Sequence, residues 1–288
     1  MRLKKFIVSG LVAVVGALAF ASVSFGASHH PTGEWERFNE CPLNRTSIEW
    51  CVDSVSSNGA FTIGKKTVPL VNPVTLQGGY EETAEGGVAF YGAENGNTLS
   101  KTAQPVPGGL LGVTAPTWWP QSIQNWFNNL INEGFTGVSA TVELAGPTSG
   151  LTAIDLNPNA LLEQKGTALG LPVKIHLQNA ILGSSCYLGS SSKPVNLQFT
   201  TGTSGSLSGS AGVLTPNEAF TLLTFNGGKF VDGTYSAPGT NGCGGIFSLF
   251  VNPLVESILG VPAGSGKNSA FLEGALSIGE AAQVRASE

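Results

Sequence analysis

Strict alternation of apolar and polar residues is the feature that most constrains the fold of this chain. In residues 138–144 every second side chain is apolar, and Ser, Thr and Glu143 lie between. Residues 171–179 repeat the pattern, with Val, Ile and Leu alternating with Lys174, His176 and Gln178. A period of two predicts strands that have one face in the core and one in water, as in antiparallel sheets.

Shorter strand patterns continue on both sides of these two. They lie at residues 61–63, 68–70, 88–91, 195–199, 219–225, 229–232 and 270–278. Residues 201–212 are rich in Gly and Ser, and we expect them to form a linker or long hairpin loop that is too poor in side chains to pack. Only 11% of residues are charged and 39 are Gly, which argues against a helical bundle.

Two helices are expected to interrupt the strands. Residues 120–131 carry apolar side chains at helical spacing, beginning with Ile123, Trp126 and Phe127, and Gly134 is the expected stop. A second helix is expected after Cys243, with Asn252 as its cap, Pro253 in its first turn and Gly260 at its end. We therefore predict one mainly β domain, an antiparallel sandwich or barrel with two short helical insertions.

The N-terminus has the pattern of a secretory signal peptide. Arg2, Lys4 and Lys5 precede an apolar run at residues 6–20, and small residues favour a cut after Gly26. A membrane anchor is the alternative, but the run is shorter than the ~20 residues of a spanning helix. We expect residues 1–26 to be removed and residues 27–288 to form a single secreted β-rich domain, extracellular or loosely associated with the cell envelope.

The four cysteines fit an exported protein. Three pairings are possible for Cys41, Cys51, Cys186 and Cys243. Cys41–Cys51 and Cys186–Cys243 are favoured, because the first closes a short loop and the second ties two distant β segments. A zinc site would need closely spaced cysteines or nearby histidines, and the sequence predicts neither a metal site nor a cofactor.

Charge limits the partners. Removal of residues 1–26 leaves 11 basic and 19 acidic residues, a net charge of −8. Such a chain is unsuited to nucleic acid and repels anionic membranes. No later segment has the length and hydropathy of a membrane span.

The sequence does not assemble a catalytic set. The histidines are His29, His30 and His176, and no G-x-S-x-G motif occurs. We interpret His176 as a solvated strand histidine and Glu143 as an outward, solubilising residue, and we assign no catalytic residue. The sequence leaves open whether the protein is an enzyme, and it favours a non-enzymatic protein.

One aromatic group is a candidate ligand surface. Trp118, Trp119, Trp126 and Phe127 lie within ten residues, beside a Pro- and Gly-rich segment. The spacing is typical of a helix packed on a sheet. The functional alternative is a partly open aromatic platform for a sugar ring or a lipid.

Several runs together resemble a family of secreted proteins of actinobacteria that has no assigned activity. These runs include FTIGKKTVPLVNPVTLQGG, LPVKIHLQNAILGSSCYLGS and LFVNPLVESILGVP. The resemblance spans residues 41–276 and implies an exported, compact protein. It implies no substrate and no site residue. Residues 205–212 depart from it, being rich in Ser and Gly where a more Pro-rich stretch is expected.

The leading functional hypothesis is a non-enzymatic secreted module that is structural or binds a partner such as an envelope glycan through its amide- and hydroxyl-rich surface. A carrier of a lipid or another apolar ligand, gated by residues 118–131 and 246–259, is the first alternative. A hydrolase using acidic residues is the second.

Overall fold

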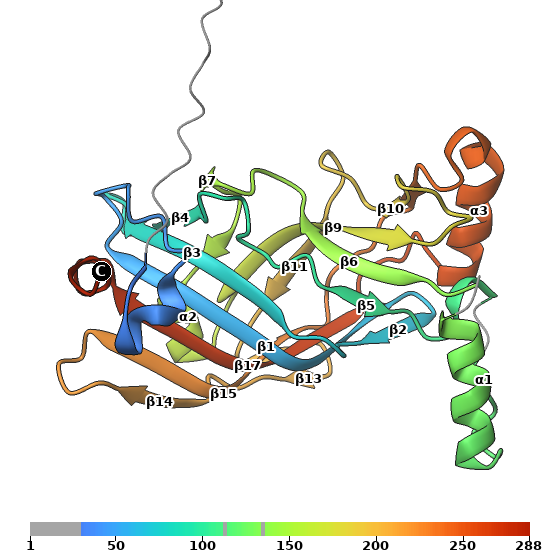
Figure 1. The fold of residues 1–288 in the computed structure, drawn as a ribbon, viewed down its shortest axis with the longest axis horizontal. Coiled ribbons are helices and arrows are strands. Elements are labelled where there is room, and N and C mark those ends of the chain that lie inside the picture. Colours follow the sequence, from blue (N-terminus) through green and yellow to red (C-terminus); the bar gives the residue numbers. More distant parts are fainter. Residues whose placement is uncertain (1–29, 112–113, 134–135) are drawn as a thin grey trace, which may run out of the picture.

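The computed structural model describes residues 30–111, 114–133 and 136–288. The expected signal peptide and the expected helix stop at Gly134 lie outside these residues. The described chain is mainly β with antiparallel sheets, which confirms the predicted fold class. Figure 1 shows two sheets stacked as a sandwich, with α4 (Ala281–Ala286) at one end and the two longest helices at the other.

The first sheet is built around the long strands β1 (Trp50–Ile63) and β17 (Ser269–Glu280), which pair along almost their whole length. Its strand order is β14-β15-β17-β1-β3-β4-β7, and β2 pairs with the end of β1. The remaining strands are β2 (Lys66–Pro69), β3 (Val74–Glu82), β4 (Val88–Gly92), β7 (Gly150–Leu151), β14 (Val213–Pro216) and β15 (Leu222–Asp232).

The second sheet is organised around β9 (Leu169–Gln178), one of the two strands with the clearest alternation. Its order is β16-β10-β9-β6-β5, and β8 and β11 also pair with β9. The other strands are β5 (Ala103–Pro105), β6 (Ser139–Leu144), β8 (Asp155–Leu156), β10 (Tyr187–Leu188), β11 (Val195–Phe199) and β16 (Thr240–Asn241). As the alternation predicts, Val173, Ile175 and Leu177 are buried between the sheets.

The main core fills the space between the two sheets and contains inward side chains of both, such as Val52 and Leu76 opposite Val173. A second cluster covers one end of the first sheet. There α4, the 3-10 helix η1 (Gly33–Phe38) and the Cys41–Cys51 disulfide pack together. The sandwich therefore has one end sealed by a small core of its own.

The other end carries the two long helices, α1 (Gln121–Glu133) and α3 (Ser248–Leu259). Two 3-10 helices precede them, η2 (Gly109–Leu111) and η3 (Gly245–Phe247). The Cys186–Cys243 disulfide joins the start of β10 to the segment leading into η3. None of the described helices is both long and apolar enough to cross a bilayer.

Two sequence expectations were wrong in detail. α3 begins at Ser248, so Asn252 lies inside the helix and is not its cap, and Pro253 is also internal. The reason is that Phe247 and Ser248 continue the turn of η3 directly into α3. Gly260 does end the helix, in a left-handed conformation with φ 74°.

The segment at 201–212 packs, contrary to the expectation of a loop without packing. It forms the hairpin of β12 (Thr203–Ser204) and β13 (Leu207–Ser208), with Thr201 and Ser204 buried. Small side chains allow this backbone to lie directly on neighbouring strands. Gly209 donates a backbone hydrogen bond to the carbonyl of Gly202.

The remaining described helix, α2 (Pro158–Glu163), is capped by the side chain of Asn157.

Candidate functional site

Two adjoining cavities between the sheets have almost entirely apolar walls. Each has a volume of about 60 Å³, several times the space that one water molecule needs. Close-packed protein interiors contain few voids of this kind. The interior of the sandwich is therefore a candidate binding site for an apolar molecule.

The two cavities follow one another along β9. The inner cavity contacts Leu171, Val173 and Ile175, and the outer cavity contacts Ile175 and Leu177. A strand rises about 3.3 Å per residue, so from Leu171 to Leu177 the two cavities together extend along about 20 Å of β9. The side chains of Ile63, Val68, Ala140 and Ile175 contact both cavities. The available space is therefore long and narrow.

The outer cavity is closed by the helical end of the molecule. Val255, Ile258 and Leu259 of α3 form part of its wall, and Leu110 of η2 forms another part. These α3 side chains contact the cavity directly. Among the described residues, Lys66 at the start of β2 is the one charged residue in the wall of either cavity.

Polar side chains hold α3 against the body. The Cys243 backbone N–H donates to Oδ1 of Asn252 at 2.9 Å, and the Thr240 N–H donates to Oε1 of Glu256 at 2.8 Å. Glu256 is the one charged residue of this helix. These contacts satisfy the polar residues of α3 on the side that faces the sandwich.

The predicted aromatic group lies on and before α1, at the same end of the molecule as α3 (Figure 1). Trp118 is 81% exposed and Trp126 is 65% exposed. Trp119 is half-buried and makes edge-to-face contacts with Trp118 and Phe127, with ring centroids 6.0 and 5.6 Å apart. Among the described residues α1 contacts η2. The exposed indoles of Trp118, just before the helix, and Trp126, on it, are accessible, and their role in binding stays a prediction.

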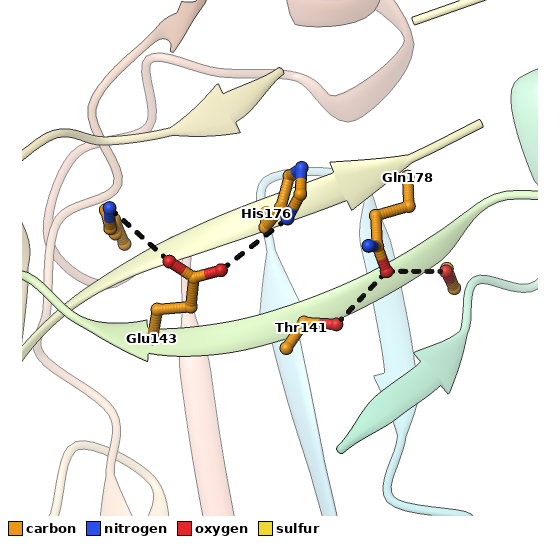
Figure 2. Close-up of polar contacts among 6 residues, drawn as sticks. Thr141, Glu143, His176 and Gln178 are labelled. Carbon is orange, nitrogen blue, oxygen red and sulfur yellow. Dashed lines mark hydrogen bonds and ion pairs between the residues drawn. The ribbon is translucent and has the colours of Figure 1, made fainter. Parts of the chain in front are cut away.

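A polar cluster on the outer face of the second sheet contains the two residues considered for catalysis. Glu143 on β6 lies beside Lys174 and His176 on β9, with Oε2–Nζ and Oε1–Nδ1 distances of 3.4 and 3.5 Å. Figure 2 shows the Glu143 carboxylate between its two partners, with Thr141 and Gln178 farther along the same strands. Register explains the contact, because Glu143 pairs with Lys174 and Thr141 with His176.

His176 is more covered than the sequence suggests. Its ring stacks on Tyr187 of β10, with centroids 4.5 Å apart, and its side chain is only 14% exposed. Its Nε2 atom is shielded from solvent and has no hydrogen-bond partner among the described residues. A Ser-His-acid site needs a nucleophile at this atom. The cluster therefore supplies an acid and an imidazole without the third group.

The described residues contain no group of three His, Cys, Asp or Glu side chains that could hold a metal ion. A shallow groove of about 460 Å³ lies near the β12–β13 hairpin, with hydroxyl and amide side chains in its wall. It is lined by Gln164, Lys165, Thr167, Gln198, Thr203 and Thr234.

Sequence reasoning allowed for an apolar pocket gated by residues 118–131 and 246–259, but it did not locate the two cavities along β9 or the exposed side of α3. Burial patterns identify which residues face the core, but a void depends on how side chains of two sheets meet. The sequence did contain one sign that the helical end is unusual, which is its lack of charge. Residues 102–132 contain no charged side chain, and residues 233–264 contain only Glu256.

No protein-family model matches the chain, and neither a curated protein nor a solved structure is significantly similar to it.

Proposed function

We propose that the protein is a non-enzymatic secreted carrier that holds an elongated apolar molecule, such as an acyl chain, between its two sheets. The observation that carries the proposal is the pair of adjoining apolar cavities along β9. Burial of apolar surface is the main driving force for such binding, at roughly 25 cal/mol per Å². A narrow space suits a linear chain better than a ring system.

The surroundings of the cavities support the same function. The described residues of their walls offer no constellation of nucleophile, base and oxyanion donors, and the His176 cluster lies on the opposite face of the second sheet. The two disulfides fit an extracellular location. The helical end provides a route for the ligand that does not require breaking a strand pair.

Binding of a fluorescent fatty acid tests the proposal. We expect saturable binding to the purified protein and competition by unlabelled fatty acids. Val68→Phe should reduce binding at least tenfold, because Val68 contacts both cavities and the added ring fills them. Val88→Phe is the matched control, since Val88 is also half-buried in the first sheet but contacts neither cavity.

The melting temperature of each variant shows whether binding is lost because the cavity is filled or because the protein no longer folds. Ala140→Leu, on the opposite wall, provides a second cavity-filling change. The proposal is wrong if no acyl probe binds saturably. It is equally wrong if the folded Val68→Phe protein binds as the wild type does.

The hydroxyl-rich groove supports a second candidate function, recognition of an envelope glycan. Its wall presents amide and hydroxyl groups, together with the Lys165 ammonium, that can exchange hydrogen bonds with sugar hydroxyls. Calorimetric titration with cell-wall oligosaccharides tests it, and Gln198→Ala should weaken any binding that occurs there. Unchanged affinity in this variant would place the glycan elsewhere.

A further inference from the structure

The outer side of η3 and α3 exposes a row of large apolar side chains. Ile246 is 93% exposed, Leu249 78% and Phe250 74%, and Phe247 and Leu254 are also exposed. Ile246, Phe250 and Leu254 are spaced by four residues and so follow one face. We call these five side chains the α3 ridge. Exposed apolar residues elsewhere are normal when scattered singly, whereas a contiguous group marks an interaction surface.

Unlike an ordinary surface helix, α3 carries apolar side chains on both sides: Val255, Ile258 and Leu259 contact the outer cavity, and the α3 ridge faces outward. A surface helix turns its apolar face to the core and its charges to water. Here Asn252 and Glu256 make hydrogen bonds to the body of the protein, and Leu249, Phe250 and Leu254 face outward. The helix is therefore held with the α3 ridge pointing away from the sandwich.

Charge is nearly absent from this end. Glu256 is the one charged residue in residues 233–264, and its carboxylate is used internally. Residues 102–132, which include most of α1, contain none. The nearby Lys65, exposed in the β1–β2 turn, has its ammonium 3.5 Å from the carbonyl of Ser257 near the end of α3. The end thus presents apolar side chains beside the exposed ammonium of Lys65, although the whole protein is acidic.

We infer that the α3 ridge, together with Trp118 and Trp126, docks on the surface of a lipid bilayer and takes up the apolar ligand there, an inference that rests on the proposed carrier function. Helices that lie in a membrane interface bury an apolar face to a depth of ~5–10 Å. Trp side chains favour the same zone, because the ring is apolar and its N–H remains hydrated.

A bilayer fits this surface better than a protein partner does. Ile246 and Phe250 protrude from the ridge and are 93% and 74% exposed, so a folded partner could cover them only with matching pockets, whereas lipid chains adapt to any shape. The absence of charges leaves no pattern for orienting a protein partner. The outer cavity lies directly behind α3, on the side opposite the ridge, so a chain leaving the bilayer has a short path to the interior.

Vesicle co-sedimentation tests the inference. The protein, isolated as its host processes it, should sediment with phosphatidylcholine vesicles. Leu249→Gln/Phe250→Gln should weaken this binding about tenfold or more, since two large apolar side chains no longer enter the lipid. Both positions are exposed, so folding should be retained. Val213→Gln/Leu214→Gln on the edge strand β14 is the matched control and should bind like the wild type.

Two further measurements distinguish the possible failures. The ridge variant should still bind the fluorescent fatty acid in solution, and Val68→Phe should still bind vesicles while losing the fatty acid. If the wild type binds the fatty acid but not vesicles, docking is wrong and the carrier function stands. If it binds vesicles but no fatty acid, the uptake step and the carrier function are wrong. If light scattering shows a dimer that the ridge variant dissociates, the ridge is an interface between copies and docking is wrong.

Discussion

Asp53 is a residue whose burial couples stability to pH in the acidic range. Burial raises the pKa of its carboxyl from 3.8 to about 6, and the nearby Arg37 partly opposes this. The folded state therefore binds the proton more tightly than the unfolded state, so the protonated form is favoured in the fold. The contribution of Asp53 to the free energy of unfolding is therefore greatest below pH 4, and it is lost as the pH rises toward and past 6.

Replacing Asp53 with Asn should therefore stabilise the protein at pH 7.5 and change little at pH 4. The pKa shift corresponds to about 3 kcal/mol, which contact with water reduces to about 2 kcal/mol. Thermal unfolding of both proteins across this pH range measures the difference. An equal melting temperature at pH 7.5 would show that the ionised carboxylate is not destabilising.

His176 offers a second test at the residue scale. His176→Phe keeps the flat ring that stacks on Tyr187 and removes the unpartnered Nε2 atom. An unsatisfied buried polar atom costs about 1–3 kcal/mol, so this variant should unfold at the same urea concentration or a higher one. His176→Ala should be less stable, because the stack is lost. A lower urea midpoint for His176→Phe than for the wild type would show that the buried Nε2 atom does not destabilise the fold.

Local alternation predicts which face each of these side chains occupies. It places Glu143 and His176 outside, and the structure does the same. The stack with Tyr187 depends on the pairing of β10 with β9, a contact that no local pattern encodes. Sequence therefore predicted the face of the sheet and missed the degree of burial.

At the scale of elements, α3 depends on a small number of polar anchors. Glu256→Ala removes the acceptor of the Thr240 N–H, a hydrogen bond to a charged group that contributes about 1.5–3 kcal/mol. We expect hydrogen exchange across residues 245–259 to accelerate while the central strands are unaffected. Ser257→Ala, at an exposed position on the same helix, is the control. Unchanged exchange in the Glu256 variant would mean that apolar contacts alone hold the helix.

The same helix shows a limit of sequence patterns, which predicted the end of α3 correctly but placed its start too late. Pro253 and Asn252 are typical of a helix start, yet η3 extends the helix by a full turn before them. Asn252 bonds to Cys243 across a disulfide-bonded turn, and this tertiary contact overrides the local preference. Long alternating strands such as β9 and β11 are predicted well, because their burial pattern repeats over several residues.

At the scale of the whole molecule, the two disulfides stabilise opposite ends. Cys41–Cys51 lies in the small core beneath α4, and Cys186–Cys243 lies beside α3 and the outer cavity. The sequence separations are 10 and 57 residues. Loop-closure entropy grows with loop length, which gives about 3 kcal/mol for the first and about 4 kcal/mol for the second.

Removing each bond separately should therefore give two different defects. Cys186→Ala/Cys243→Ala should lower the melting temperature more and should also weaken binding of the acyl probe, because the segment leading into α3 is no longer tied to β10. Cys41→Ala/Cys51→Ala should lower the melting temperature less and leave probe affinity unchanged well below that temperature. Thermal unfolding and probe titration on both variants measure the two effects. If both pairs reduce affinity equally, the helical end is not the route to the interior, and the ligand reaches the cavities elsewhere.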